Sequence, residues 1–239
     1  MKSLLLFCGV LALLFQRTSA VQAQQVLLHN EVAQDTTHPA SGPNRAYFGH
    51  FYLAYTAVVG RASGPGADLV FGRSGEFALG MRNKFRLSQT LAVGAALSYA
   101  RLAYHLAQNG QKTVPTTTQY QHERLRFQQL QGEGFVRFNA GRRGNAIGRY
   151  LDLTGWGGRV LGSAHYYEDK PAAGSKKRQT TERGLDYVQR WPYGLGVRLG
   201  SGRCALIGRY RLSSSFVGAA KARYPEFPRW AVGLELGWF

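Results

Sequence analysis

The sequence has few cysteines and no long apolar run. Only 2 of its 239 residues are cysteine, and Cys8 lies in an apolar segment at the N-terminus. Removal of that segment would leave Cys204 alone, which excludes a small domain stabilised by disulfides. No heptad repeat appears and no apolar run is long enough for a helix across a bilayer, which needs roughly 20 residues. Coiled coils and helical membrane spans are therefore excluded.

Acidic residues are also scarce. Asp and Glu total 13 against 30 Lys and Arg, which gives a formal net charge of +17. Such an excess favours contact with anionic partners. The basic residues are spread along the chain rather than gathered on one segment, so nucleic acid is not an expected partner. A local basic cluster comprises Lys176, Lys177, Arg178 and Arg183.

The N-terminus has the pattern of an export signal. Lys2 precedes an apolar run at 4–15, and small residues follow it up to Ala23. We predict a cleaved signal peptide over residues 1–23, with Ala20 as the alternative cleavage site. Residues 24–44 lack periodicity and are rich in turn-forming residues, which favours a periplasmic linker. Residues 45–239 remain as the folded domain.

From residue 45 onward, apolar and polar residues alternate in segments that turn-rich stretches separate. A period of two is typical of a strand whose faces meet different surroundings. The clearest case is the C-terminus, where apolar residues from Trp230 to Trp238 alternate with glycines, Ala231 and Glu235. We predict eight strands, at 45–60, 75–87, 90–106, 123–138, 150–167, 185–199, 204–217 and 228–239.

The links between these strands alternate in length. The links 61–74, 107–122, 168–184 and 218–227 are long and polar, whereas 88–89 and 200–203 are tight and 139–149 is intermediate. Outer-membrane barrels have this asymmetry, with short periplasmic turns and longer outer loops. The sequence therefore predicts an all-β fold, an eight-stranded antiparallel up-and-down transmembrane β-barrel, in a bacterial outer membrane.

Two segments carry a resemblance to a known class. Residues 75–106 form a strand, a tight turn and a strand ending in Tyr and Arg, and the chain closes on aromatic residues. Residues 45–239 thereby resemble the small, porin-like outer-membrane β-barrel proteins of the Bacteroidetes group. The resemblance implies that the assembly machinery reads the closing strand. Phe239 is in phase with Glu235, so either a terminal kink restores its phase or Trp238 takes its place.

The alternation also predicts what each face carries. Aromatic residues near the strand ends should form two interfacial girdles, with Trp191, Trp230, Trp238 and Phe239 among them. An eight-stranded barrel has an interior just wide enough for side chains, and buried charges must be paired. We therefore expect an ion-pair network inside, made of Arg82, Glu133, Arg137, Asp186, Arg190, Arg198, Arg209, Arg211 and Glu235.

Two strands change the phase of their apolar residues. Leu102 and Tyr104 are out of phase with the apolar residues before them, which predicts a β-bulge near Ala100. A second slip is predicted between Phe127 and Leu130 in the next strand. The facing of the strand at 150–167 is ambiguous because it is rich in glycine.

Chemistry-bearing motifs are absent. The 6 histidines show neither an i,i+4 pair nor a cysteine partner, which argues against a metal site. The only candidate catalytic residues for a lipid A hydrolase are His165 and the serines at 213–215. We therefore expect that the protein is not an enzyme and binds no cofactor. We expect a monomer that contacts outer-membrane lipid and lipopolysaccharide and has a structural or loop-mediated role. The alternatives are a narrow channel, a lipid A hydrolase and a soluble exported barrel.

Overall fold

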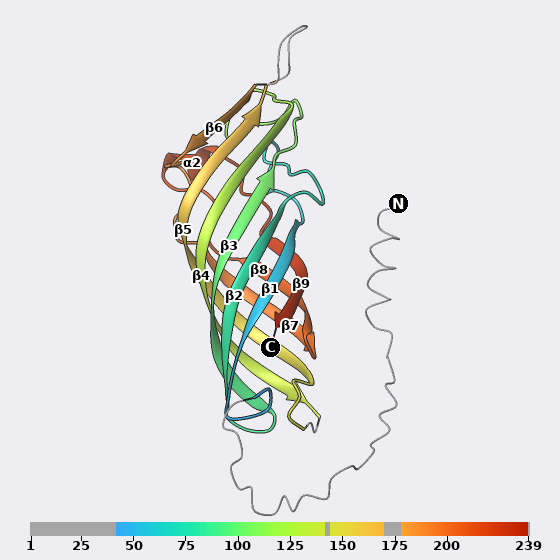
Figure 1. Ribbon diagram of the computed structural model, residues 1–239. Coiled ribbons are helices and arrows are strands. Elements are labelled where there is room, and N and C mark those ends of the chain that lie inside the picture. The colour runs from blue at the N-terminus through green and yellow to red at the C-terminus, as the bar shows by residue number, and fades with distance from the viewer. Residues whose placement is uncertain (1–41, 142–143, 170–177, 239) are drawn as a thin grey trace, which may run out of the picture. The chain divides into compact units, whose positions relative to one another are not determined.

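The computed structural model describes residues 42–141, 144–169 and 178–238, whose strands form a closed antiparallel barrel (Figure 1). The predicted eight-stranded barrel is confirmed. The predicted signal peptide and most of the predicted linker lie outside the described residues. The wall consists of β1 (Tyr47–Val59), β2 (Gly75–Arg86), β3 (Leu91–His105), β4 (His122–Ala140), β5 (Arg149–Glu168), β7 (Tyr193–Ser201), β8 (Cys204–Arg211) and β9 (Trp230–Trp238).

The first and last strands close the barrel. Successive strands of the wall pair in an antiparallel manner, and β5 pairs with both β4 and β7. The ring is completed where β9 pairs with β1, from Trp230 opposite Val59 to Trp238 opposite Phe51. Closure gives the backbone groups of β1 and β9 partners on both sides, which removes the open edges of the sheet.

The links alternate in length as predicted. The links 87–90 and 202–203, and the described parts of the link 141–148, lie at one end of the barrel, here called the short-link end. The links 60–74, 106–121 and 212–229, and the described parts of the link 169–192, lie at the opposite, long-link end (Figure 1). Two small elements that the pattern did not predict belong to these long links. They are strand β6 (Gln179–Arg183), which pairs with the last residues of β5, and helix α2 (Ala219–Arg223).

Two of the predicted strands are too long. The strand predicted at 185–199 begins only at β7, and the one predicted at 204–217 ends with β8. In the excluded parts, an isolated bridge joins Val188 to Phe216. Both side chains are buried because these segments turn inward and fill the end of the barrel. Pro192, which lacks a backbone N–H for the ladder, marks the boundary before β7.

Strands β3 and β4 keep one phase along their whole length, so the predicted phase slips are wrong. In β3 the even-numbered residues face the interior, and in β4 the odd-numbered residues do. The pairing of β3 with both neighbours is continuous through Ala100. The register shift lies instead in β5, where Leu161 is an extra residue opposite Gln128 and Gln129.

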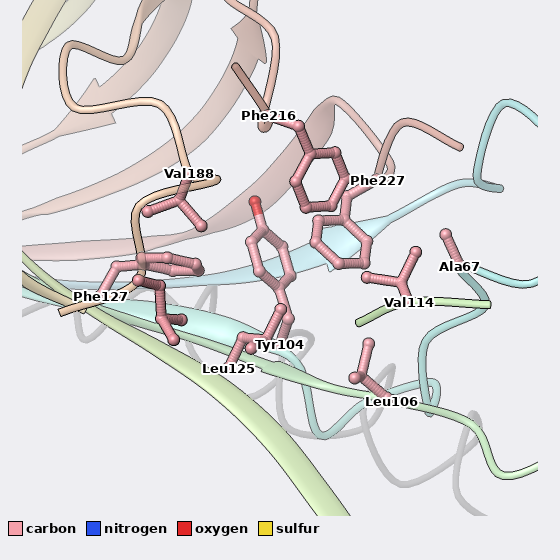
Figure 2. Close-up of a cluster of buried hydrophobic side chains, with 10 residues drawn as sticks. Ala67, Tyr104, Leu106, Val114, Leu125, Phe127, Val188, Phe216 and Phe227 are labelled. Carbon is pink, nitrogen blue, oxygen red and sulfur yellow. The ribbon is translucent and has the colours of Figure 1, made fainter. Parts of the chain in front are cut away.

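The kind of residue on each face of the sheet changes along the barrel, whereas the register of the backbone in β3 and β4 does not. Near the long-link end Tyr104, Leu125 and Phe127 face inward and join an apolar cluster (Figure 2). On the same parts of β3 and β4, Arg101 and Arg126 face outward. An apolar residue that moves from the outer to the inner face gives the same sequence signal as a slip of register.

Candidate functional site

The middle of the barrel interior is filled by a connected set of ion pairs. Arg82 makes a two-point contact with Glu235, in which Nη2 donates to Oε2 at 2.8 Å. Arg198 lies beside this pair, with its Nε 3.3 Å from the Glu235 carboxylate. Glu133 accepts a hydrogen bond from Arg198 and lies 3.6 Å from Arg82. The four strands β2, β4, β7 and β9 are thereby joined across the lumen.

Asp152 extends this set to a third arginine. Its side chain is 0 % exposed. Arg137 donates to it from Nε and Nη2 at 2.7 and 2.8 Å, and Arg198 donates from Nη1 at 2.8 Å. Each oxygen therefore accepts a charge-assisted hydrogen bond. A buried carboxylate is stable only with such partners, because the interior does not solvate it as water does.

A second polar set lies between this network and the long-link end. Arg209 donates to Glu76 at 2.6 Å and to the side-chain oxygen of Gln131 at 3.0 Å. The amide of Gln131 in turn donates to Glu76 at 2.9 Å and to Gln129 at 3.0 Å. Residues from β2, β4 and β8 meet here, so this set also spans the lumen.

The charges of the two sets balance. Each guanidinium group has a carboxylate partner, which leaves no excess charge to attract a permeating ion. A cavity of about 20 Å³ among these residues has room for about one water molecule. The middle of the barrel is a packed polar structure. Its charged members are Arg82, Arg137, Arg198 and Arg209, with Glu76, Glu133, Asp152 and Glu235.

An apolar cluster, here called the plug, closes the long-link end (Figure 2). The Tyr104 and Phe227 rings stack at its centre with their centroids 4.6 Å apart, and Phe216 packs on Phe227 at 5.2 Å. Every long link contributes side chains, so these links fold inward over the barrel. The plug comprises Ala67, Tyr104, Leu106, Val114, Leu125, Phe127, Leu185, Val188, Phe216 and Phe227.

The short-link end is closed as well. Lys84 donates a hydrogen bond to the carbonyl of Pro43, and Arg86 donates from Nη1 to the carbonyl of Asn44 at 2.8 Å. These two cations fix the residues that lead into β1. A small apolar cluster lies next to them, made of Phe48, Ile147, Tyr150 and Ala205.

A buried carboxylate organises the rim of the long-link end. Glu123 pairs with Lys112 and bonds to His165 Nε2 at 2.8 Å. His165 Nδ1 lies 3.4 Å from the Glu182 carboxylate. The link 106–121 and strand β6 are thereby held to β4 and β5. His165, considered only for the alternative of a hydrolase, is thus part of the contacts that hold these elements together.

Glu226 anchors the last long link. Its carboxylate accepts hydrogen bonds from Arg211 at 2.7 Å, from the Ser214 hydroxyl at 2.7 Å and from the Ser215 backbone at 2.8 Å. Burial by itself would raise its pKa, but the bonds from Ser215, Arg211 and Ser214 outweigh burial and hold the pKa below its usual value. Ser63 bonds to the Glu226 backbone, which connects a second long link to the same point.

The serines at 213–215 do not meet His165. Ser213 Oγ accepts the backbone N–H of Tyr193, and Ser214 bonds to Glu226. In the described residues no hydrogen bond joins any of these serines to His165. The candidate catalytic residues considered for a hydrolase therefore do not form a serine–histidine pair.

The outer wall carries a broad apolar surface. Trp191 is 61 % exposed, Trp230 55 % and Trp238 83 %, and the apolar residues between the last two face outward along β9. The same outward alternation occurs on the other strands of the wall. Phe239 lies outside the described residues. Trp238 is the last residue of β9 and faces outward.

The structure places most of the expected interior network inside the barrel and corrects two members. Asp186 is 94 % and Arg190 is 71 % exposed, and they pair with each other at 3.6 Å outside the lumen. They are misplaced because their segment, predicted as strand, is a link. Arg211 faces inward but bonds to Glu226 next to the plug. The remaining six lie in the two polar sets: Arg82, Glu133, Arg137, Arg198, Arg209 and Glu235.

Of the basic cluster, Arg178 and Arg183 are exposed at the long-link end, Arg183 within β6. Lys176 and Lys177 lie outside the described residues.

Several residues of these charged sets were not predicted from the sequence. Glu76 is in phase with Arg82 on β2, and this phase was a usable signal for its inward position. Asp152 gave a weaker signal because the glycines of β5 obscured the facing of that strand. Lys112 and Glu123 are brought together by the fold of a long link, and no local pattern predicts such a contact.

The chain matches no known family model, and no curated protein is significantly similar to it. No helix among the described residues has the length and apolar character to cross a membrane. Within the same part of the chain, no group of three or more His, Cys, Asp or Glu side chains is arranged to hold a metal ion.

Proposed function

We propose that this chain is an integral outer-membrane barrel protein, of the small type found in the Bacteroidetes group, with a structural or loop-mediated interaction role. It would be exported by its signal peptide and folded by the barrel-assembly machinery as a monomer. The long-link end would face the outside and the short-link end the periplasm. Lipid and lipopolysaccharide would surround the wall.

The observation that carries this proposal is the polarity of the barrel wall. Soluble β-barrels bury apolar side chains and expose polar ones. Here Arg82 and Asp152 are fully buried, whereas large apolar residues such as Phe51 and Leu195 are more than half exposed on the outside. In water such an outer surface would be a strong aggregation hazard. In a bilayer it is the favourable arrangement.

The strand lengths support the same proposal. Strand β9 is 9 residues long and carries outward apolar residues from end to end. A tilted strand crosses a bilayer with roughly 9–11 residues. Strands β4 and β5 are 19 and 20 residues long, and the extra residues of β4 at the long-link end include the outward Arg124 and Arg126. The apolar surface therefore ends where the charged surface begins.

The interior argues against the alternative role of a channel. Two neutralised polar sets fill the middle, the plug closes one end and a smaller cluster closes the other. A cavity of about 20 Å³ among the polar sets and one of about 30 Å³ beside the plug share no lining residue. A structural or surface-contact role is more compatible with a filled lumen.

Cell fractionation tests the proposal most directly. The full chain, expressed with its signal peptide in a Gram-negative host, should appear in the outer-membrane fraction and migrate as a heat-modifiable band on unboiled gels. Recovery from the soluble periplasm would overturn the membrane assignment. In planar bilayers the purified protein should give no conductance steps, and regular steps would favour the channel.

A further inference from the structure

Two adjoining grooves lie on the outer wall beside the half of β5 that is nearer the long-link end. Strand β7 stops pairing with β5 at Gly157, and β6 begins to pair with it only at Ala164. Between these points the neighbouring link is held by a few backbone hydrogen bonds, such as the one from Val160 to Arg190 at 2.9 Å. The interruption of the wall leaves one groove of about 730 Å³ and a second of about 530 Å³. Arg159 lines both.

The first groove is lined by arginines. Arg126 of β4 and Arg183 of β6 lie in one row on either side of Ala164, at a separation of two strands, or roughly 10 Å. Ala164 has a small side chain and the nearby Gly162 has none, which leaves the groove open between the strands that carry the two arginines. Arg159 lies at the edge of the groove that is nearer the short-link end.

These arginines are not neutralised by the protein. Asp186 lines the groove, but it is paired with Arg190. Among the described residues, no carboxylate forms an ion pair with Arg126, Arg159 or Arg183. Three cations held together without acidic partners favour a multivalent anion, and guanidinium groups match the oxygen atoms of a phosphate.

The second groove is apolar and lies on the bilayer side of the first. Gly132 and Gly157 pair with each other and form its floor, and Leu130 and Trp191 belong to its walls. The absence of side chains at these two outward positions creates a hollow in a surface that is otherwise covered by large apolar residues. Arg159 stands over the Trp191 ring at 5.6 Å, where the two grooves meet.

We propose that the two grooves together bind one lipid with an anionic phosphorylated headgroup, its phosphate between Arg126, Arg159 and Arg183 and one acyl chain in the glycine-floored hollow. The proposal rests on membrane insertion of the barrel. It differs from general contact with lipid because it names one site on β4, β5 and β6. The order of the grooves, with cations beyond the apolar hollow, matches the order of headgroup and chain in the outer leaflet.

Lipid retention measured by native mass spectrometry tests the site. Protein folded in maltoside detergent is titrated with phosphatidic acid or with phosphatidylcholine of the same acyl chains. We expect one phosphatidic acid to be retained with at least about tenfold preference, and the double variant Arg126→Gln, Arg183→Gln to lose that preference. Arg149→Gln, an exposed arginine at the other end of β5, should keep it.

The acyl groove has its own matched pair of variants. A Cβ added at Gly132 meets nothing closer than the Gly157 carbonyl at 4.0 Å, and one at Gly134 has no heavy atom within 4 Å. Gly132→Leu would fill the hollow and should weaken phosphatidic acid binding by about tenfold. Gly134→Leu, on the same face of β4, should bind as the parent does. Heat-modifiable migration confirms that each variant is folded.

Three outcomes would overturn the site. Equal retention of both lipids, or unchanged retention in the arginine variant, would remove the headgroup groove. Competition by soluble glycerol 3-phosphate at the lipid concentration would assign the arginines to a soluble phosphate compound instead. A folded barrel that inserts into vesicles but shows no lipid preference contradicts only this inference, whereas a barrel that fails to insert contradicts the proposed function.

Discussion

At the scale of single residues, the interior depends on exact pairing of buried charges rather than on apolar packing. Replacing a buried ion pair by apolar residues is often harmless, but removing one partner leaves an uncompensated charge. Of the four carboxylates in the two polar sets, all but Glu76 serve two arginines, as Asp152 does for Arg137 and Arg198. The loss of one such carboxylate therefore affects several strands.

Asp152→Ala tests this dependence. The substitution leaves Arg137 without its carboxylate partner and removes one of the partners of Arg198, so we expect a loss of roughly 3–5 kcal/mol in the free energy of unfolding. The measurement is urea-induced unfolding of the protein in lipid vesicles. Asp186→Ala removes an exposed carboxylate and should change stability by less than about 0.5 kcal/mol. Equal effects of the two substitutions would contradict the assigned interior network.

Glu226 supplies a pH-dependent contribution at the long-link end. Its folded pKa lies below the ordinary value of 4.5, so the unfolded link binds protons at a higher pH than the folded one. The stabilisation is fully present above the unfolded pKa and is lost as the pH falls through the lowered folded pKa.

Glu226→Gln should weaken the long-link closure by about 2 kcal/mol at neutral pH, because charge-assisted bonds to Arg211 and the serines are lost. Protease cleavage within link 212–229 measures this closure. The difference in cleavage between the parent and the variant should be greatest at neutral pH and shrink on acidification below about pH 4. A difference that grows in acid would contradict the sign of the pKa shift.

At the scale of the elements, alternation gives a strand and its two faces but not the surroundings of each face. Tyr104 and Phe127 were in phase with the interior throughout, and only the change of the interior from polar to apolar made them resemble a slip of register. The strand boundaries at 185–199 and 204–217 failed for a related reason. Apolar residues of the links were counted as wall, although they form the plug.

The candidate site was predictable to the extent that strand phase determines it. Arg82, Arg198 and Glu235 lie on clearly alternating strands, and their inward positions follow from that pattern. Asp152 and Arg159 lie on the glycine-rich β5, where few side chains define the faces. Contacts between links, and the grooves left where β7 stops, depend on tertiary structure and have no local signal.

The outward face of β7 provides a test at this scale. Leu195 is 56 % exposed within the strand, so Leu195→Arg places a charge near mid-membrane at a cost of roughly 2–4 kcal/mol. Ser201→Arg, at the short-link end of the same strand, lies at the interface and should cost at most about 1 kcal/mol. Folding yield in lipid vesicles compares the two. Equal yields would argue against a bilayer around this surface.

At the scale of the whole molecule, the described barrel is closed at both ends and reversed in polarity relative to a soluble barrel. Its short links are compact, whereas its long links fold over the plug and carry exposed basic residues such as Arg61 and Arg223. The two ends therefore present different surfaces, which would face the two sides of the proposed membrane. The proposed orientation assigns the long-link end to the cell exterior.

Two glycines in open positions allow that orientation to be tested with little disturbance. Gly110 lies in long link 106–121 and Gly144 in short link 141–148, and a Cβ at either position meets no heavy atom within 4 Å. In a Cys204→Ser background, which removes an exposed thiol, Gly110→Cys should react with a membrane-impermeant maleimide in intact cells. Gly144→Cys should react only after the outer membrane is opened, because its link would face the periplasm. Since both positions are exposed in the barrel, detergent-solubilised protein should label at both, and this sample controls for reactivity. Labelling of Gly144→Cys alone in intact cells would reverse the orientation, and labelling of neither in opened cells would contradict the exposure of these links.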